Sequence, residues 1–247
     1  MANNLRRIWD ADPDAAPKER QSFSDDVVGR FRSGRLVKMG GRETPEALNE
    51  WRVTTGDPVV AAKISERMGG TVEEWDTEKE DNLQVLTDAP TVRIIIDPDG
   101  VDASFKQFVP GAGLTHHCDG FEYLSPDEDR GTACGCPSLI AERKLAADKQ
   151  RGPKPSVDIT FRLEEATELG RFRFNSGSWK LVEALGPLFA ELDNYPGQAV
   201  RASLTIENVS YVPQKGPRAG QTISYNKPVV KVFGAYAEAA DDLPAAA

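Results

Sequence analysis

The spacing of apolar residues predicts an antiparallel sheet in the last third of the chain. Four segments alternate apolar and polar side chains at a period of two, as strands with one buried face do. These expected strands cover residues 157–163, 170–174, 200–209 and 227–236. Between the second and third, residues 178–195 have the spacing of a helix, which we expect to be interrupted near Gly186 and Pro187.

The first third of the chain carries helix signals instead. One helix is expected to begin at Ser24, and a second at Thr44, where Pro45 would take the first helical position. The third signal is the clearest, because Asp57 is a good N-cap residue and Gly69 a good stop. The apolar face of this third helix would consist of Val60, Ile64 and Met68.

The middle of the chain predicts one strand and one helix. The strand covers residues 92–96 and should close in a turn at residues 97–100, where Asp, Pro and Gly follow one another. The helix covers residues 138–149 and ends before Gly152.

These elements together predict an α+β fold, in which a helical N-terminal part packs with a C-terminal antiparallel sheet and a Cys/His loop lies between them. The expected divisions are a flexible arm (1–21), a mainly helical part with one strand and a zinc loop at 116–136 (22–150), a β-rich part (151–236) and a disordered tail (237–247). Leu5, Ile8 and Trp9 are the apolar residues of the arm. No apolar run is long enough to span a membrane, so we expect no membrane partner and a cytoplasmic protein.

The charge of the chain argues against binding to bare DNA. With 39% hydrophobic and 28% charged residues the composition is that of a globular protein, but the formal net charge is −9. Binding through phosphates needs clustered lysine and arginine. Two acid-free stretches supply such residues, and each is either a local phosphate contact or an ordinary exposed face. Their basic residues are Arg30, Arg32, Arg35, Lys38 and Arg42 in the first stretch, and Lys215, Arg218, Lys227 and Lys231 in the second. An acidic strip around Trp75 is either a solvated loop or a docking site for a basic partner.

One short loop holds every cysteine and histidine of the chain. Cys118 is followed by Cys134 and Cys136, and His116 and His117 precede it directly. Zinc takes four nitrogen or sulfur ligands at tetrahedral corners, and two short ligand pairs joined by a loop commonly supply them. His116 lies two residues before Cys118, so in an extended strand both side chains point to the same side. We therefore predict a structural zinc site formed by Cys118, Cys134, Cys136 and His116, while a turn at this point would make His117 the fourth ligand instead.

Three other interpretations of this loop stay open. The cysteines could be ordinary thiols of a reduced protein, or Cys134 and Cys136 could form a redox pair. A catalytic zinc would need a nearby general base, and Glu122 is available, although the H-E-x-x-H and H-x-E motifs are absent. The chain also lacks the phosphate-binding and nucleophile-elbow motifs, and Ser176 and Ser178 are better explained as a helix N-cap than as nucleophiles. These observations predict a protein that is not an enzyme.

Several stretches together resemble a known family. They are WRVTTGDPVVAAKI, DNLQVLTDAPTVRIII, the loop from CDG to CGCP, and DITFRLEEATELGRFRFNSGSW, within a region from about Phe31 to Phe233. The chain resembles the recombination directionality factors of actinobacterial temperate phages, which work with large serine integrases of the phiC31 type. Relatives carry a further cysteine near the position of Gly152 or Pro153, and this chain has none.

The resemblance implies a non-enzymatic switch in the cytoplasm of a bacterial host. Such a factor binds the integrase at its coiled-coil region and changes the preferred reaction from attP × attB integration to attL × attR excision. Attachment-site DNA would then be reached mainly through the integrase. Two alternatives come from other classes: a zinc-containing nucleic-acid-binding accessory protein of phage replication or repair that uses the basic stretches, and a metal-dependent hydrolase.

Overall fold

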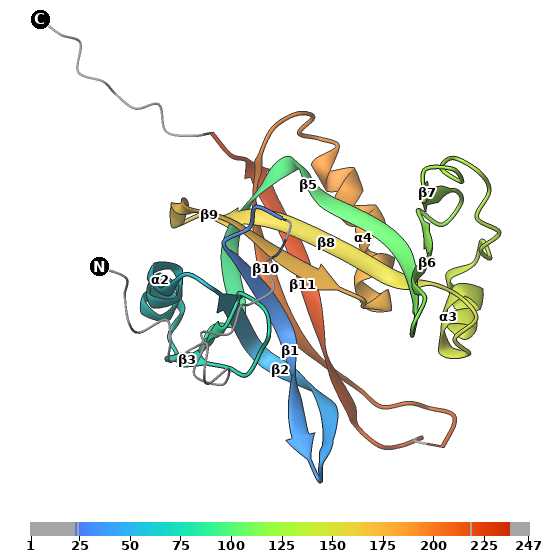
Figure 1. The fold of residues 1–247 in the computed structure, drawn as a ribbon, viewed down its shortest axis with the longest axis horizontal. Helices are drawn as coiled ribbons and strands as arrows, with labels where there is room; N and C mark the ends of the chain where they lie inside the picture. The colour runs from blue at the N-terminus through green and yellow to red at the C-terminus, as the bar shows by residue number, and fades with distance from the viewer. Residues whose placement is uncertain (1–22, 24, 218, 238–247) are drawn as a thin grey trace, which may run out of the picture.

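The protein is mostly β in the part of the chain that the structure describes. The computed structural model describes residues 23, 25–217 and 219–237, and Figure 1 shows an extended twisted sheet with short helices around it. Eleven strands form this sheet, and the described residues contain three helices. In order across the sheet the strands are β11 (Ile223–Ala235), β10 (Val200–Tyr211), β5 (Thr91–Val109), β8 (Lys154–Leu163), β9 (Ala166–Ser176), β1 (Gly29–Met39), β2 (Arg42–Thr55), β4 (Leu83–Leu86) and β3 (Val72–Glu74).

Two further strands branch from the sheet at β5. β6 (Gly113–Cys118) pairs with the C-terminal end of β5, and β7 (Tyr123–Ser125) pairs with β6. Together with the loop that follows and helix α3 (Ile140–Asp148) they form a lobe at one end of the molecule, at the right of Figure 1. We call residues 113–148 the Cys/His lobe. All strand pairs are antiparallel except β1 with β9, which makes the sheet mixed.

The expected helical N-terminal part is wrong. Residues 29–55 form the β1–β2 hairpin, and the helix expected at Thr44 and Pro45 lies within strand β2. The turn of this hairpin is Gly40-Gly41, where φ is +58° and +80°, a conformation that only glycine adopts without strain. Residues 25–28 are not helical either, and Ser24 lies outside the described residues. Pairing of β1 with β2 therefore overrides the local signals for a helix start.

Burial of aromatic side chains explains why the hairpin forms. Phe31 of β1 is 1% exposed, and its ring centroid lies 5.8 Å from that of Trp51 on β2 and 5.3 Å from that of Phe161 on β8. Phe172 and Phe174 of β9 complete the cluster. Each buried aromatic side chain contributes a few kcal/mol, roughly 1.5–3 for phenylalanine, whereas an N-cap contributes about 1. The tertiary core thus outweighs the local helix signals.

The expected helix after Asp57 is confirmed. Helix α2 (Pro58–Met68) begins after Asp57, whose carboxylate accepts a hydrogen bond from the amide of Val59 at 2.7 Å. Gly69 follows the helix with φ +75°. The expected apolar face is buried against the sheet, and Ala61 is buried with it.

The other two helices also lie where the sequence predicts them. α3 falls within the expected residues 138–149, and α4 (Trp179–Leu192) begins after Ser178, which accepts a hydrogen bond from the amide of Leu181 at 3.4 Å. The expected interruption of this second helix is wrong, because α4 continues through Pro187. No helix among the described residues is long and apolar enough to cross a membrane.

The four expected C-terminal strands are confirmed as β8, β9, β10 and β11. The expected turn after Ile96 is wrong, since β5 continues to Val109 and residues 97–100 form an irregularity in its pairing with β8. A side chain at Gly100 would place Cβ only 2.6 Å from the carbonyl oxygen of Thr160. The Asp-Pro-Asp-Gly sequence therefore serves as a bulge that lets β5 run from the main sheet into the Cys/His lobe.

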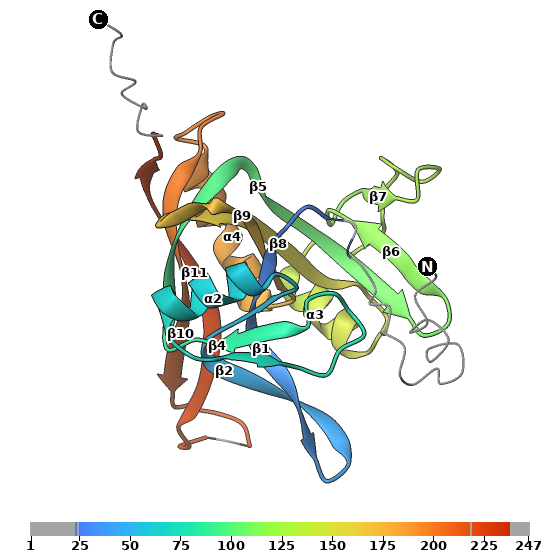
Figure 2. The same cartoon turned by 60° about the vertical axis from the view of Figure 1, so that its left-hand side comes forward.

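Two hairpins extend from the body at the same end of the molecule (Figures 1 and 2). They are β1–β2 and β10–β11, and the side-chain amide of Asn226 on β11 donates to the carbonyl oxygen of Leu48 on β2 at 2.8 Å. The sheet is therefore coiled, so that β11 at one edge contacts β2 although other strands lie between them in the sheet order. The expected arm with Leu5, Ile8 and Trp9, and all but the first residue of the expected tail, lie outside the described residues.

Candidate metal centre

Strand pairing positions the first two candidate ligands. β6 holds His116 and Cys118 two residues apart, opposite Gln107 and Phe105 of β5. Alternate residues of a strand point to the same face, so both side chains project into the lobe. His117 points elsewhere, and its Nδ1 lies 2.9 Å from the hydroxyl of Ser125. The strand geometry therefore separates the two adjacent histidines.

The loop after β6 returns the other two ligands to the same place. The Asp119 carboxylate accepts from the amides of Phe121 and Glu122 at 2.7 and 2.8 Å, which turns the chain sharply. The amide of Cys134 then donates to the carbonyl oxygen of Phe121 at 2.8 Å. Cys134 and Cys136 thus lie beside the strand that carries Cys118, although sixteen residues or more separate them in sequence.

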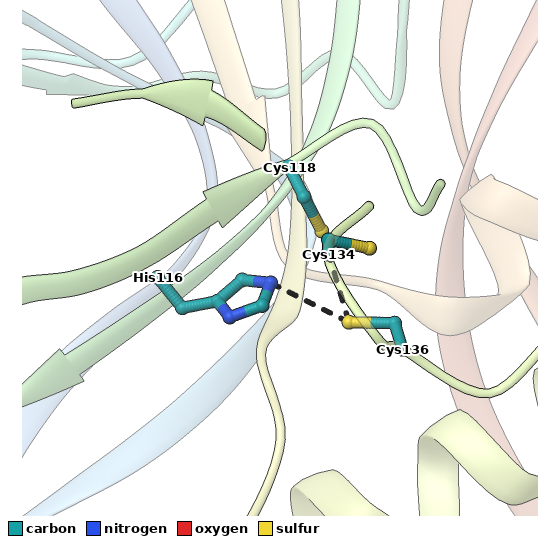
Figure 3. Close-up of side chains that lie close together, drawn as sticks. All are labelled: His116, Cys118, Cys134 and Cys136. Atoms are coloured by element: carbon teal, nitrogen blue, oxygen red, sulfur yellow. Dashed lines mark hydrogen bonds between the residues drawn. The ribbon is translucent and has the colours of Figure 1, made fainter. Parts of the chain in front are cut away.

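The four side chains converge as a metal site requires. One ligand atom from each of His116, Cys118, Cys134 and Cys136 lies within 4.8 Å of the others (Figure 3). The Sγ atoms of Cys118 and Cys136 are 3.8 Å apart, and Cys136 Sγ is 3.4 Å from His116 Nε2. Zinc bonds of 2.0–2.3 Å place neighbouring ligands of a tetrahedron about 3.3–3.8 Å apart. The cluster could therefore hold a metal ion with little movement.

Burial shifts the pKa of three of these side chains. It raises the pKa of Cys118 to about 12, and the nearby charge of Cys136 adds to the rise. Burial also raises the pKa of Cys136 and lowers the pKa of His116. At neutral pH the imidazole is therefore a neutral donor, while the thiols of Cys118 and Cys136 keep their protons until a cation replaces them. The raised pKa of Cys136 argues against a reactive redox pair that includes this residue, because its thiolate would have to form readily.

A cavity of about 190 Å³ adjoins the cluster. His116, Cys134 and Cys136 line one side of it, and the side chain of Arg143 from α3 lines another. Gly152 and Pro153 also line it, so the position at which the family resemblance implies a further cysteine borders this cavity. His116 on β6 and the segment that precedes β8 therefore border the same cavity.

The other sequence candidates are parts of the scaffold. Trp75 of the acidic strip is held in place, because its indole N–H donates to the carbonyl oxygen of Asp81 at 2.6 Å and the Arg52 guanidinium lies 4.4 Å from its ring. The Oγ of Ser176 accepts from the amide of Ser178 at 3.2 Å, so it supports the N-terminus of α4. Glu122 is exposed and outside the ligand cluster.

Acidic neighbours compensate several residues of the two basic stretches. The ion pairs are Arg30–Asp25, Arg32–Asp81, Arg35–Glu46 and Lys227–Glu207. Arg218 lies outside the described residues. The described basic residues therefore do not form a uniformly positive face, which would be needed to attract bare DNA.

Arg143 was missed by the sequence interpretation. It stands in a helix that is otherwise mostly exposed, and only Arg143 and Ala147 of α3 are buried. The sequence offered no signal for it, because the burial of a helical arginine depends on what the helix packs against.

Comparison with known proteins identifies the family but not a structural relative. No solved structure matches this chain. A family model described as Gp3-like, recombination directionality factor-like, matches residues 28–232, which include the Cys/His lobe and nearly all of the sheet. The chain therefore belongs to the Gp3-like family of recombination directionality factor-like proteins.

Proposed function

We propose that this protein is a recombination directionality factor that binds a phage large serine integrase. Binding would switch the integrase from attP × attB integration to attL × attR excision in the cytoplasm of the bacterial host. The observation that carries the proposal is the family match over residues 28–232. The integrase would keep all bond breaking and joining, and this protein would act without chemistry of its own.

The physical requirement for such a switch is a difference in affinity. A ligand moves an equilibrium only by as much as it prefers one state over the other. Reversing a preference from 1:99 to 99:1 takes about 5.5 kcal/mol, which a few well-buried contacts at each protomer of the integrase can supply. We propose that these contacts are made to the coiled-coil region of the integrase, and that DNA is reached mainly through it. The net charge of −9 supports an indirect route to DNA.

Purified components test this proposal directly. The protein is mixed with a candidate large serine integrase and with short attP, attB, attL and attR DNAs, and products are separated on a gel. We expect attL × attR products only when the protein is present, and fewer attP × attB products than without it. An acidic protein of similar size is the control. Absence of excision products together with undiminished integration contradicts the proposal, whereas salt-sensitive binding to bare DNA without integrase supports a nucleic-acid accessory role instead.

We further propose that the ligand cluster holds a structural zinc. Cys118, Cys134, Cys136 and His116 would be its four ligands, and the ion would fix the fold of the loop between β7 and α3. Four protein ligands leave no open position for substrate, which is typical of structural sites and not of catalytic ones. The support comes from the donor set and the distances between donor atoms.

Elemental analysis tests the zinc site. Protein purified without chelator should contain about one zinc per chain. The Cys134→Ser, Cys136→Ser double variant should lose it, and His117→Ala should retain it, because His117 bonds Ser125 and not the cluster. Equal metal content in all three proteins would refute the assignment.

A further inference from the structure

Arg143 occupies an unusual position for an arginine. It is only 7% exposed, and it lies on α3 within the Cys/His lobe. One guanidinium nitrogen, Nη2, donates to the carbonyl oxygen of Gly120 at 2.6 Å. The guanidinium carbon lies 5.0 Å from the ring centroid of Phe105 and 6.0 Å from that of Phe121. The positive charge is thus surrounded by aromatic rings and backbone.

A buried charge of this kind needs an anionic partner. Isolated charges are costly to remove from water, and buried arginines are normally paired with carboxylates or other anions. Among the described residues no carboxylate lies within ion-pair distance of Arg143, and its Nη1 atom is buried without a hydrogen-bond partner. The pKa of Asp119 is lowered by hydrogen bonds from the amides of Glu122 and Phe121 and, to a smaller extent, by the charge of Arg143, but this carboxylate is exposed. The cavity that the guanidinium lines also contains His116, Cys134 and Cys136. The ligand cluster would therefore become a buried source of negative charge on that side once a bound cation displaces the thiol protons.

The charge of a bound metal centre would match this need. Three thiolates and a neutral imidazole around a divalent cation leave the centre with a net charge of about −1. One guanidinium neutralises it. Second-shell groups of this sort orient ligands and stabilise the charge that the metal creates.

We propose that Arg143 is the counter-charge of the metal–thiolate centre and fastens α3 to it. This inference rests on the proposed zinc site, and makes Arg143 a positioning residue and not a ligand. Metal binding would then order two segments at once, the ligand loop directly and α3 through the guanidinium. α3 is also joined to α4 by an ion pair between Lys144 and Glu183. The lobe is thereby coupled to the body of the protein on both sides.

The turn after Cys118 is shaped around the guanidinium. Gly120 has φ +107°, and a Cβ atom at that position would lie 2.6 Å from Nη1 of Arg143. Only glycine leaves room for the guanidinium between this turn and the cluster while its carbonyl oxygen accepts from Nη2. The sequence Cys-Asp-Gly therefore places a ligand, a turn-forming carboxylate and the arginine contact next to one another.

Zinc affinity in full-length variants tests the proposal. Arg143→Met removes the charge but keeps a long apolar stem, and Arg143→Lys keeps a positive charge. Competition with a chromophoric chelator should show that the methionine variant binds zinc about 10- to 100-fold more weakly, the range found for second-shell partners. The lysine variant should retain most of the affinity. Arg151→Met is the matched control, because Arg151 lines the same cavity but is exposed, and it should bind as the natural protein does.

A second measurement separates a metal role from simple packing. Thermal unfolding of each variant is compared with zinc and with excess chelator. If Arg143 acts through the metal centre, Arg143→Met lowers the melting temperature with zinc and changes it far less in chelator. Arg143→Gln, which can still donate to the carbonyl oxygen of Gly120, should behave in the same way and serves if the methionine variant does not fold.

Three outcomes would overturn the inference. They are unchanged zinc affinity in Arg143→Met and Arg143→Gln, equal destabilisation of these variants with and without zinc, and a natural protein that binds no zinc. The last outcome also removes the zinc site, whereas the first two leave it standing. The recombination assay is separate from all three, so failure of the regulatory proposal is recognised independently.

Discussion

At the scale of single residues, Asp25 links two strands that are far apart in sequence. Its carboxylate accepts from Arg30 of β1 at 2.5 Å and from Arg173 of β9 at 3.0 Å. Burial alone would raise the pKa of Asp25, but the hydrogen bonds and charges of the two arginines outweigh it and lower the pKa. This residue lies where β1 and β9 form the one parallel pair of the sheet.

Replacing Asp25 by asparagine should lower stability by about 1 kcal/mol near neutral pH, since the side chain is only partly buried. A carboxylate with a lowered folded pKa stabilises the protein above its unfolded pKa, near 3.8, and loses this contribution as the pH falls through the lower folded value. The difference between the natural protein and Asp25→Asn in urea unfolding should therefore shrink as the pH is lowered below about 4. Asp26→Asn is the control, because Asp26 is 70% exposed and should change little. A difference that does not depend on pH would contradict this account.

At the scale of elements, α4 persists although it contains Gly186 and Pro187. Proline within a helix costs about 3 kcal/mol and glycine about 1. Leu181, Leu185 and Leu188 are buried against the sheet, and each contributes roughly 1.5–3 kcal/mol. Burial of the apolar face therefore exceeds the local cost, and the helix is continuous.

Gly186→Ala should stabilise the protein by less than about 0.5 kcal/mol, because the ring of Pro187 crowds a Cβ on the preceding helical residue and offsets part of the gain in helix propensity. Gly186 has helical backbone and is exposed, and an added Cβ meets no atom within 4 Å outside its neighbours in sequence. Gly70→Ala is the opposite case, because φ is +82° and its Cβ would lie 1.9 Å from the carbonyl oxygen of Leu86. Urea denaturation should show a higher midpoint for the first variant and a much lower one for the second. A lower midpoint for Gly186→Ala would mean that crowding against Pro187 outweighs the higher helix propensity of alanine.

At the scale of the whole molecule, the hydrophobic core and the Cys/His lobe are separate parts of the structure, and different interactions stabilise them. The core cluster joins the main sheet with α2 and α4 and contains none of the three cysteines. Among the described strands, β6 pairs with the C-terminal end of β5, and β7 pairs with β6 alone. In our proposal the lobe would depend on the ligand cluster and on Arg143, while the sheet depends on aromatic packing.

Removal of metal should accordingly loosen the lobe and leave the sheet folded. In hydrogen exchange, excess chelator should speed the exchange of amides in residues 113–136 and in α3. Amides of β8 and β9, which lie in the centre of the sheet, should exchange at unchanged rates. Cys134→Ser, Cys136→Ser protein without chelator should give the same pattern. Uniform acceleration throughout the chain would show that lobe and core unfold together.

The sequence by itself determined the elements whose signals are local. Period-two alternation marked β8 to β11, and Asp57 with Gly69 bounded α2. The candidate ligands could also be predicted from the sequence, because every cysteine and histidine lies within residues 116–136. The two-residue period of a strand then distinguishes His116 from His117.

Only the tertiary structure decided what depends on partners distant in sequence. Thr44 and Pro45 have the chemistry of a helix start, yet they lie in a strand, because pairing of β1 with β2 brings Phe31 and Trp51 into the aromatic core. Residues 97–100 have the chemistry of a turn, yet β8 on one side holds them in a bulge. The burial of Arg143 also depends on residues distant in sequence, because the loop after β6 packs against α3 and covers the guanidinium. Local propensities are worth about 1 kcal/mol each, and the burial available only in the assembled fold exceeds them.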